Sequence, residues 1–215
     1  MIQNFDILLI LLAIIFTTII ISFIWRWLST HYSLPCPSWL AWMIELDNPF
    51  AKAHHANSII HASKLAPDMQ VLDAGCGPGR LTIPMAKKLD KTGKVTALDI
   101  QQAMLDKVRT KAEKESLCNI TYLHAALGEG KIPLKTFDRI YLITVIGEIP
   151  DKKKALNEIY HALKPDGILV ITETIFDPHY QAFKKLAALT DAAGFQLDLK
   201  VGNILAYTAN FRKKN

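Results

Sequence analysis

The stretch that decides the fold of this chain reads Val71-Leu72-Asp73-Ala74-Gly75-Cys76-Gly77-Pro78-Gly79. Two apolar residues and an acid lead into three glycines at alternate positions, as at the end of a buried parallel strand. The glycines allow a sharp turn and let a ligand approach the backbone. Leu81, Met85 and Leu89 follow at helical spacing. The sequence therefore predicts a strand, a glycine turn and a helix, an arrangement that binds nucleotide-like ligands at the helix N-terminus.

A second β-like run, Val95 to Asp99, supports this interpretation because it also ends in an acid. Asp99 lies 20 positions after Gly79. At that place a carboxylate at the end of the second strand is expected to accept hydrogen bonds from ribose hydroxyls. The alternative role for Asp99 is to cap the helix that follows it.

The segment Asp73 to Gly79 resembles the first motif of class I S-adenosylmethionine (SAM) dependent methyltransferases, in which an acid precedes the first glycine by two positions. Dinucleotide dehydrogenases usually carry G-x-G-x-x-G without that acid. The resemblance extends over residues 65–213 and implies that SAM is the cofactor.

From Met69 onward, strand-like and helix-like segments alternate, which predicts an α/β fold with a doubly wound, mostly parallel sheet of seven strands. The last two strands are separated only by a short turn around Gly202-Asn203, so they are expected to form an antiparallel C-terminal hairpin. The predicted strands are 70–74, 94–99, 120–124, 138–145, 167–173, 195–200 and 204–211, and the predicted helices are 51–65, 79–89, 101–116, 152–163 and 178–193.

The resemblance also implies which residues contact the cofactor. Asp73 would position the methionine end through its neighbours and water, Asp99 would hold the ribose, and Ile100 would lie beside the adenine. The family often has an acid after the third strand, whereas this chain has His124 followed by two alanines. Backbone groups of those alanines, or the side chain of Glu129, would then contact the adenine. The predicted cofactor-binding residues are Asp73, Gly75, Cys76, Gly77, Gly79, Asp99, Ile100, Ala125, Ala126 and Thr144.

Two residues on the acceptor side are candidates for catalysis. Glu148 follows the fourth strand and His179 the fifth, and residues beyond these strand ends face both cofactor and acceptor. Glu148 would orient an acceptor or act as a base, or else it is a loop or capping acid. His179 would remove a proton from a phenol or thiol, or else it is a surface residue at the start of the next helix.

The segments Leu163 to Gly167 and Gly147 to Pro150 most resemble the branch that contains ubiquinone and menaquinone C-methyltransferases. This likeness implies an enzyme that methylates a hydrophobic or lipid-like small molecule of the quinone-precursor type. Methylation of a phospholipid amine or of a hydrophobic thiol is the alternative within the enzymes. A non-catalytic, membrane-tethered SAM-binding protein is the alternative from another class.

The N-terminal stretch from Ile7 to Trp25 contains nineteen residues and no charge, close to the length that a bilayer core demands. It predicts a transmembrane helix, with the lipid bilayer as a partner. Arg26 after the span and Asp6 before it favour a cytoplasmic catalytic domain in a single-pass membrane protein. The predicted division is a transmembrane anchor over 1–30, an apolar interfacial linker helix over 31–48 and a methyltransferase domain over 49–215.

Charge is distributed unevenly along the chain, whose formal net charge is +5. Residues 1–48 carry one basic and three acidic side chains, so residues 49–215 hold the excess of 24 basic over 17 acidic groups. A basic domain can face anionic lipid or nucleic acid. The basic runs lack interleaved aromatics that would stack on bases, so no nucleic-acid partner is predicted. The three cysteines and the histidines of 51–65 do not form a metal-binding pattern, so no metal is predicted.

Overall fold

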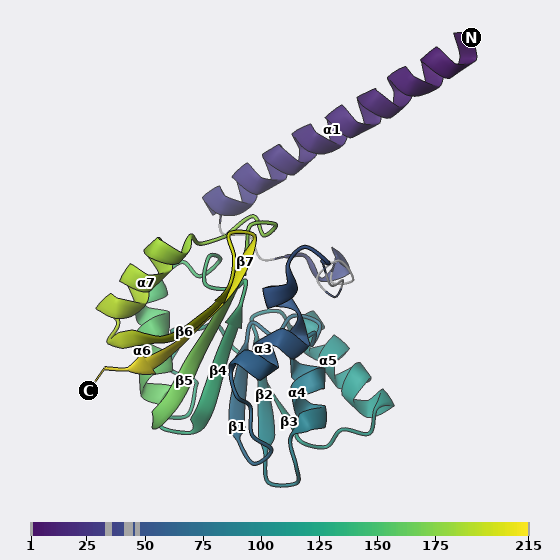
Figure 1. The fold of residues 1–215 in the computed structure, drawn as a ribbon. Coiled ribbons are helices and arrows are strands. Elements are labelled where there is room, and N and C mark those ends of the chain that lie inside the picture. The colour runs from purple at the N-terminus through teal and green to yellow at the C-terminus, as the bar shows by residue number, and fades with distance from the viewer. Residues whose placement is uncertain (1, 33–35, 41–44, 46–47, 215) are drawn as a thin grey trace.

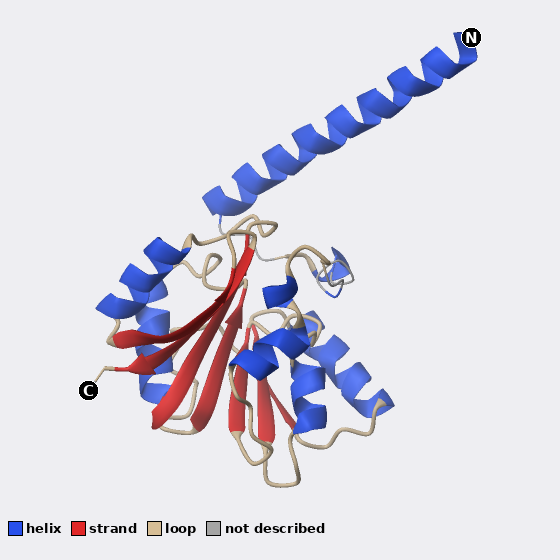
Figure 2. Ribbon diagram, viewed as in Figure 1, coloured by secondary structure: helices blue, strands red, loops and turns tan. Residues whose placement is uncertain are grey.

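A computed structural model describes residues 2–32, 36–40, 45 and 48–214. Its centre is a seven-stranded sheet in the order β3-β2-β1-β4-β5-β7-β6 (Figures 1 and 2). β7 runs antiparallel to both of its neighbours, and the remaining pairs are parallel. The predicted sheet with its antiparallel C-terminal hairpin is therefore confirmed. The strands are β1 Gln70–Ala74, β2 Lys94–Asp99, β3 Ile120–His124, β4 Phe137–Ile143, β5 Leu163–Thr174, β6 Phe195–Gly202 and β7 Ala206–Lys213.

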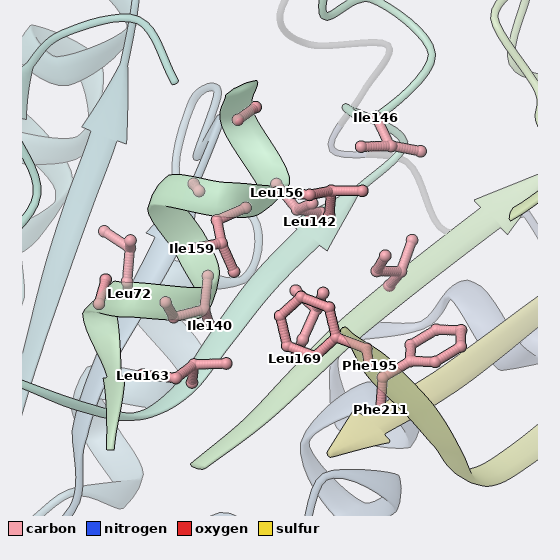
Figure 3. Packing of buried hydrophobic residues seen from close by; sticks show 14 of the residues in the cluster. Leu72, Ile140, Leu142, Ile146, Leu156, Ile159, Leu163, Leu169, Phe195 and Phe211 are labelled. Carbon is pink, nitrogen blue, oxygen red and sulfur yellow. The ribbon is translucent and has the colours of Figure 1, made fainter. Parts of the chain in front are cut away.

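Helices cover both faces of the sheet. On one face, α3, α4 and α5 pack against residues such as Val71 and Val95. On the other face, α6 and α7 pack against Leu72, Leu169 and Phe195, among others (Figure 3). Adjacent residues of β1 thus enter different cores, as the alternation of side chains along a strand requires. The helices are α1 Ile2–Tyr32, α3 Ala56–Ala62, α4 Thr82–Lys88, α5 Gln102–Lys114, α6 Lys152–Ala162 and α7 Phe183–Ala192, with short 3₁₀ helices η1 Ser38–Leu40 and η2 Lys52–His54.

β5 begins earlier than predicted, at Leu163 rather than at residue 167. Phe137 pairs with Leu163 and Arg139 pairs with Ile168, so β5 uses several more residues than β4 over this interval. The predicted turn around Pro165 is therefore an irregularity inside the strand. This agrees with the tolerance of proline at bulges, where no ladder hydrogen bond is required of it.

The predicted helix over 51–65 is divided into η2 and α3 by His55, which has an extended backbone. Side chains from the sheet hold the end of α3. Asn210 Nδ2 donates to the Ala62 carbonyl at 2.8 Å, and Arg139 Nε donates to the Ser63 carbonyl at 2.8 Å. These bonds satisfy carbonyls that the helix itself leaves unpaired.

The prediction of a transmembrane helix is wrong. The apolar stretch lies within α1, which continues to Tyr32, contains Asp6, Arg26 and His31 and extends away from the sheet (Figure 1). In the part of the chain that the structure describes, no helix combines the length and the apolar character needed to cross a bilayer. The prediction of a single-pass membrane protein with a cytoplasmic domain is corrected by the same finding.

Half of the predicted linker helix over 31–48 lies outside the described residues. Within this range, Ser38 begins the three-residue η1.

Candidate active site

The candidate site lies at the carboxyl ends of the parallel strands. β1 pairs with β2 on one side and with β4 on the other, so the strand order reverses beside β1. Ligands of open α/β sheets bind in the crevice at such a reversal. The glycine turn follows β1, Asp99 ends β2 and Glu148 follows β4, so all three lie at this edge.

The glycine turn is fastened to the end of β2 by backbone hydrogen bonds. The amides of Gly75 and Cys76 both donate to the Leu98 carbonyl, at 2.7 and 2.9 Å. The amide of Gly77 donates to Asp99 Oδ2 at 2.9 Å. The two sequence features that predicted the cofactor site are therefore in direct contact.

Gly77 leaves room for a ligand against the turn. Its φ angle is +51°, in the left-handed region, and a Cβ built on it would meet no heavy atom within 4 Å. At Gly75 the space is instead filled, since a Cβ there would collide with Val145 beside β4. An open backbone surface next to a buried carboxylate fits the adenosyl and ribose parts of SAM, because the ribose hydroxyls are donors.

Asp73 is held from the helix that follows the turn. The residue is 2% exposed, and its carboxylate accepts a hydrogen bond of 2.6 Å from Thr82 Oγ1. Burial raises the pKa of Asp73 to about 6, although the Thr82 bond opposes this shift. Asp73 thus ties β1 to α4 and fixes the turn between them.

The region predicted to contact adenine has an open apolar side chain. Ile100 is 57% exposed, and its carbonyl accepts a hydrogen bond of 2.9 Å from His124 Nε2. The Ala125 amide donates to the Asp99 carbonyl at 3.2 Å, which holds the Ala125–Ala126 backbone beside Ile100. Glu129, proposed from sequence as an alternative contact, pairs instead with Lys131 at 2.8 Å.

Two other predicted cofactor residues, Cys76 and Thr144, differ in how they could contact a ligand. The Cys76 side chain is 6% exposed and packs against Ile83, Ala97 and Leu105, so only its backbone faces the turn. Thr144 directly follows β4 and has a φ of +57°, which a β-branched residue rarely adopts. Backbone strain of this kind concentrates at functional sites.

Glu148 lies in the turn after β4. Burial raises its pKa to about 8, and the neighbouring carboxylates of Asp177 and Asp99 add to the shift. Both predicted sides of the site, Asp99 toward the cofactor and Glu148 toward the acceptor, are thus close enough to interact electrostatically. A carboxyl group that titrates near neutrality is suited to accept or hold a proton.

His179 lies against the same turn, in the loop that follows β5. A Cβ on Gly147 would collide with the His179 carbonyl, so only glycine permits this approach. The His179 amide donates to Asp177 Oδ1 at 2.7 Å, and the residue is 5% exposed. His179 is therefore part of the buried wall of the site, not of the α7 surface.

Glu173, near the end of β5, is a buried acid that is not among the site residues predicted from the sequence. Its side chain is 1% exposed, and Oε2 accepts a hydrogen bond of 2.8 Å from the Gln181 amide. Among the described residues, Oε1 has no hydrogen-bond partner. Burial, with smaller contributions from Asp177 and Glu148, raises the pKa of Glu173 to about 8.

We expect Glu173→Gln to reduce the pH dependence of stability. Between the ordinary glutamate pKa of about 4.3 and the raised value, folded Glu173 keeps a proton that the unfolded chain has lost. The wild-type free energy of unfolding should therefore fall as the pH rises through this window and level off above about pH 8. Denaturant unfolding at several pH values should show that the free energy of unfolding falls less with rising pH in the variant than in the wild type. Glu113→Gln, which changes an exposed glutamate, is the control; an equal fall in both variants would contradict the assignment.

Segments that precede the sheet contact the cofactor side. Gln101 Nε2 donates to the Cys36 carbonyl at 2.9 Å, and Lys111 pairs with Glu45 while donating to the Pro78 carbonyl at 2.8 Å. The carboxylates of Glu148 and Asp177 help burial to raise the pKa of the Cys36 thiol, which places Cys36 near the acceptor side.

We expect Asp99→Ala to weaken cofactor binding. Asp99 is 6% exposed, and its two carboxylate oxygens accept bonds from the amides of Gly77, at 2.9 Å, and Gln101, at 2.8 Å. Removing the carboxylate takes away the charged acceptor expected for the ribose hydroxyls, which should cost about 1–3 kcal/mol of binding free energy. Calorimetry with S-adenosylhomocysteine measures the loss. Asp106→Ala removes an exposed acid of α5 and should leave the affinity unchanged; an unchanged affinity for Asp99→Ala as well would show that Asp99 is not part of the site.

Comparisons with known proteins agree with this geometry. The family model of the methyltransferase domain matches residues 71–167. This part of the chain is a class I SAM-dependent methyltransferase domain. Its cofactor is therefore SAM, as the sequence predicted.

The methyltransferase domain has relatives of known sequence and structure. The ubiquinone/menaquinone biosynthesis C-methyltransferase UbiE of Vibrio vulnificus (strain YJ016) is 32% identical over 70% of this chain and 57% of its own length. The demethylmenaquinone methyltransferase of Lactiplantibacillus plantarum is 37% identical over 51% of this chain and 47% of its own length. The chain thus spans about half the length of these relatives. A SAM-dependent methyltransferase from Aquifex aeolicus shares the fold, with a TM-score of 0.70 at 22% identity over 80% of this chain and 97% of its own.

Proposed function

We propose that the chain transfers a methyl group from SAM to a ring carbon of a hydrophobic, quinone-type acceptor. The observation that carries this proposal is Glu148, a partly buried acid on the acceptor side whose pKa is raised to about 8. The names of the UbiE and demethylmenaquinone methyltransferase relatives support the acceptor class. We also propose that residues 49–215 form the catalytic unit.

The residues proposed to hold the cofactor follow β1 to β4. Gly77 offers its open backbone to the adenosyl group, Asp99 accepts from the ribose hydroxyls, and Ile100 lies beside the adenine. Asp73 fixes the turn on the methionine side. The remaining proposed contacts are Gly75, Cys76, Gly79, Ala125, Ala126 and Thr144, with Cys76 acting through its backbone.

The acceptor side provides proton transfer. When bound, SAM supplies an electrophilic methyl group, whose bond to the positively charged sulfur breaks with the electron pair left on sulfur. Attack by a ring carbon requires an electron-rich, reduced ring and ends with the loss of the proton on that carbon. Glu148 in its ionised form is proposed to take that proton. His179, which lies against the same turn as Glu148, is proposed to accept the proton of a ring hydroxyl.

Methyl transfer from radiolabelled SAM tests the proposal directly. The purified chain is incubated with a reduced naphthoquinone that lacks the ring methyl group, with phosphatidylethanolamine, and with an alkyl thiol. We expect label in the naphthoquinol alone, and mass spectrometry should place the new methyl on carbon. Label in the amine or the thiol would favour the alternative acceptors. SAM binding without transfer to any of the three would favour a non-catalytic binding protein.

A further inference from the structure

A hollow lies beside the acceptor side of the site, between residues 49–53 and the turn of the β6–β7 hairpin. Its volume is about 260 Å³. The two walls are fixed to each other, since Thr208 Oγ1 donates to the Ala53 carbonyl at 2.8 Å. A Cβ on Gly202 would lie 2.8 Å from the Cβ of Ala53, so glycine permits this close approach. The lining residues are Pro49, Phe50, Lys52, Ala53, Gly202, Asn203 and Ala206.

Both walls of the hollow lead into the site. On one wall the chain continues to His54, whose carbonyl accepts a hydrogen bond of 2.6 Å from Arg80, the residue after the glycine turn. On the other wall, the Leu205 carbonyl accepts bonds from the Ile175 amide at 2.9 Å and from Thr174 Oγ1 at 3.0 Å. Ile175 begins the loop that carries His179. The hollow and the proposed site of methyl transfer are therefore parts of one edge of the sheet.

Three large apolar side chains stand exposed on the segments that surround the hollow. Phe50 is 72% exposed, Ile204 is 82% exposed and Phe176 is 52% exposed. Single exposed apolar residues are ordinary, but several on neighbouring segments mark a binding surface. Among the lining residues, Lys52 alone carries a charged side chain. A charged or strongly polar ligand would find few partners here, whereas an apolar chain would gain from leaving water.

We propose that this hollow and its exposed rim, Phe50, Phe176 and Ile204, bind the apolar side chain of the methyl acceptor. The inference rests on the proposed function, because it requires the acceptor ring to lie beside Glu148. Pockets that enclose a whole small molecule usually have volumes of about 300–1,000 Å³. A hollow below that range suits one segment of a longer chain, with the remainder lying along the rim.

The proposal predicts that acceptor affinity depends on chain length through this surface. Reduced naphthoquinones without the ring methyl group are compared when they carry no side chain, one prenyl unit or two. The test variant is Phe50→Ser/Ile204→Ser, which changes two exposed side chains. The control is Leu134→Ser, since Leu134 is 71% exposed but lies before β4, at the opposite edge of the sheet.

In the wild type and in the control, kcat/KM should rise with chain length. In the double variant, kcat/KM for the longest compound should fall about tenfold, mainly through KM. The compound without a side chain should be methylated at the wild-type rate by all three proteins. Equal chain-length dependence in the double variant and the wild type would overturn the inference.

A binding measurement separates this inference from the proposed function. Calorimetry in the presence of S-adenosylhomocysteine compares the same compounds without requiring turnover. Tighter binding of the longer compounds, lost in the double variant, supports the hollow even if no methylated product forms, which would refute only the proposed reaction. Equal binding of all three compounds by the wild type would overturn the inference whether or not the ring is methylated.

Discussion

Gly77→Val should abolish SAM binding. The φ of Gly77 is +51°, where a β-branched residue is strained, and the space into which a side chain would project is open for the ligand. A valine there would occupy the cofactor surface and disturb the amide that donates to Asp99. We expect the affinity for S-adenosylhomocysteine to fall by at least about 100-fold, measured by calorimetry.

Gly130→Val is the matched control for this change. Gly130 also has a positive φ, +76°, with no heavy atom within 4 Å of a built Cβ, but it lies in the exposed loop between β3 and β4. The two variants therefore carry similar backbone strain, and only Gly77→Val should lose the cofactor. Normal binding by Gly77→Val would mean that the cofactor lies elsewhere.

Glu148→Gln should lower kcat by about 10²–10⁴, the usual contribution of a positioned base. The wild-type rate should rise as the pH increases toward about 8, because burial holds the proton on Glu148 below that pH and a base must be ionised to act. Glutamine cannot ionise, so the remaining activity of the variant should lack this rise. Initial rates with the demethylated naphthoquinol across the pH range provide the measurement.

The variant is needed because Glu173 also titrates near pH 8, so the wild-type pH profile alone does not identify the base. Binding of S-adenosylhomocysteine should be retained in Glu148→Gln. Glu129→Gln, which changes an exposed acid paired with Lys131, should behave as the wild type. A full rate with an unchanged pH profile in Glu148→Gln would remove Glu148 from the proposed chemistry.

Local pattern predicted the core strands well. The bounds of β1, β2 and β3 agree with the prediction because each is a short apolar run between polar segments. Topology then predicted that the acids after these strands share one edge of the sheet. β5 was placed less well, since Pro165 indicates a turn locally and only pairing with β4 keeps it in the strand.

The bonds that hold the site depend on tertiary structure, which local pattern does not encode. Thr82 holds Asp73 across a turn, and Gln101 holds the carbonyl of Cys36 across 65 positions of sequence. Glu173 was omitted from the predicted site for the same reason. Its burial depends on the loop after β5, which folds back so that the Gln181 amide donates to the Glu173 carboxylate. The prediction of a membrane span rested on the length and apolar composition of one segment. It is wrong, because no helix among the described residues is long and apolar enough to cross a bilayer.

The position of β7 has a consequence for how the protein is made. This strand follows β6 in the sequence, yet it lies between β5 and β6 and pairs with both. Until it leaves the ribosome, β5 has an unpaired edge and β6 has no neighbour in the sheet. Unpaired strand edges recruit other chains, so a nascent or C-terminally truncated polypeptide is prone to aggregate. Cleavage that removes β7 would therefore expose the edge of β5 and detach β6, the outermost strand, from the rest of the sheet.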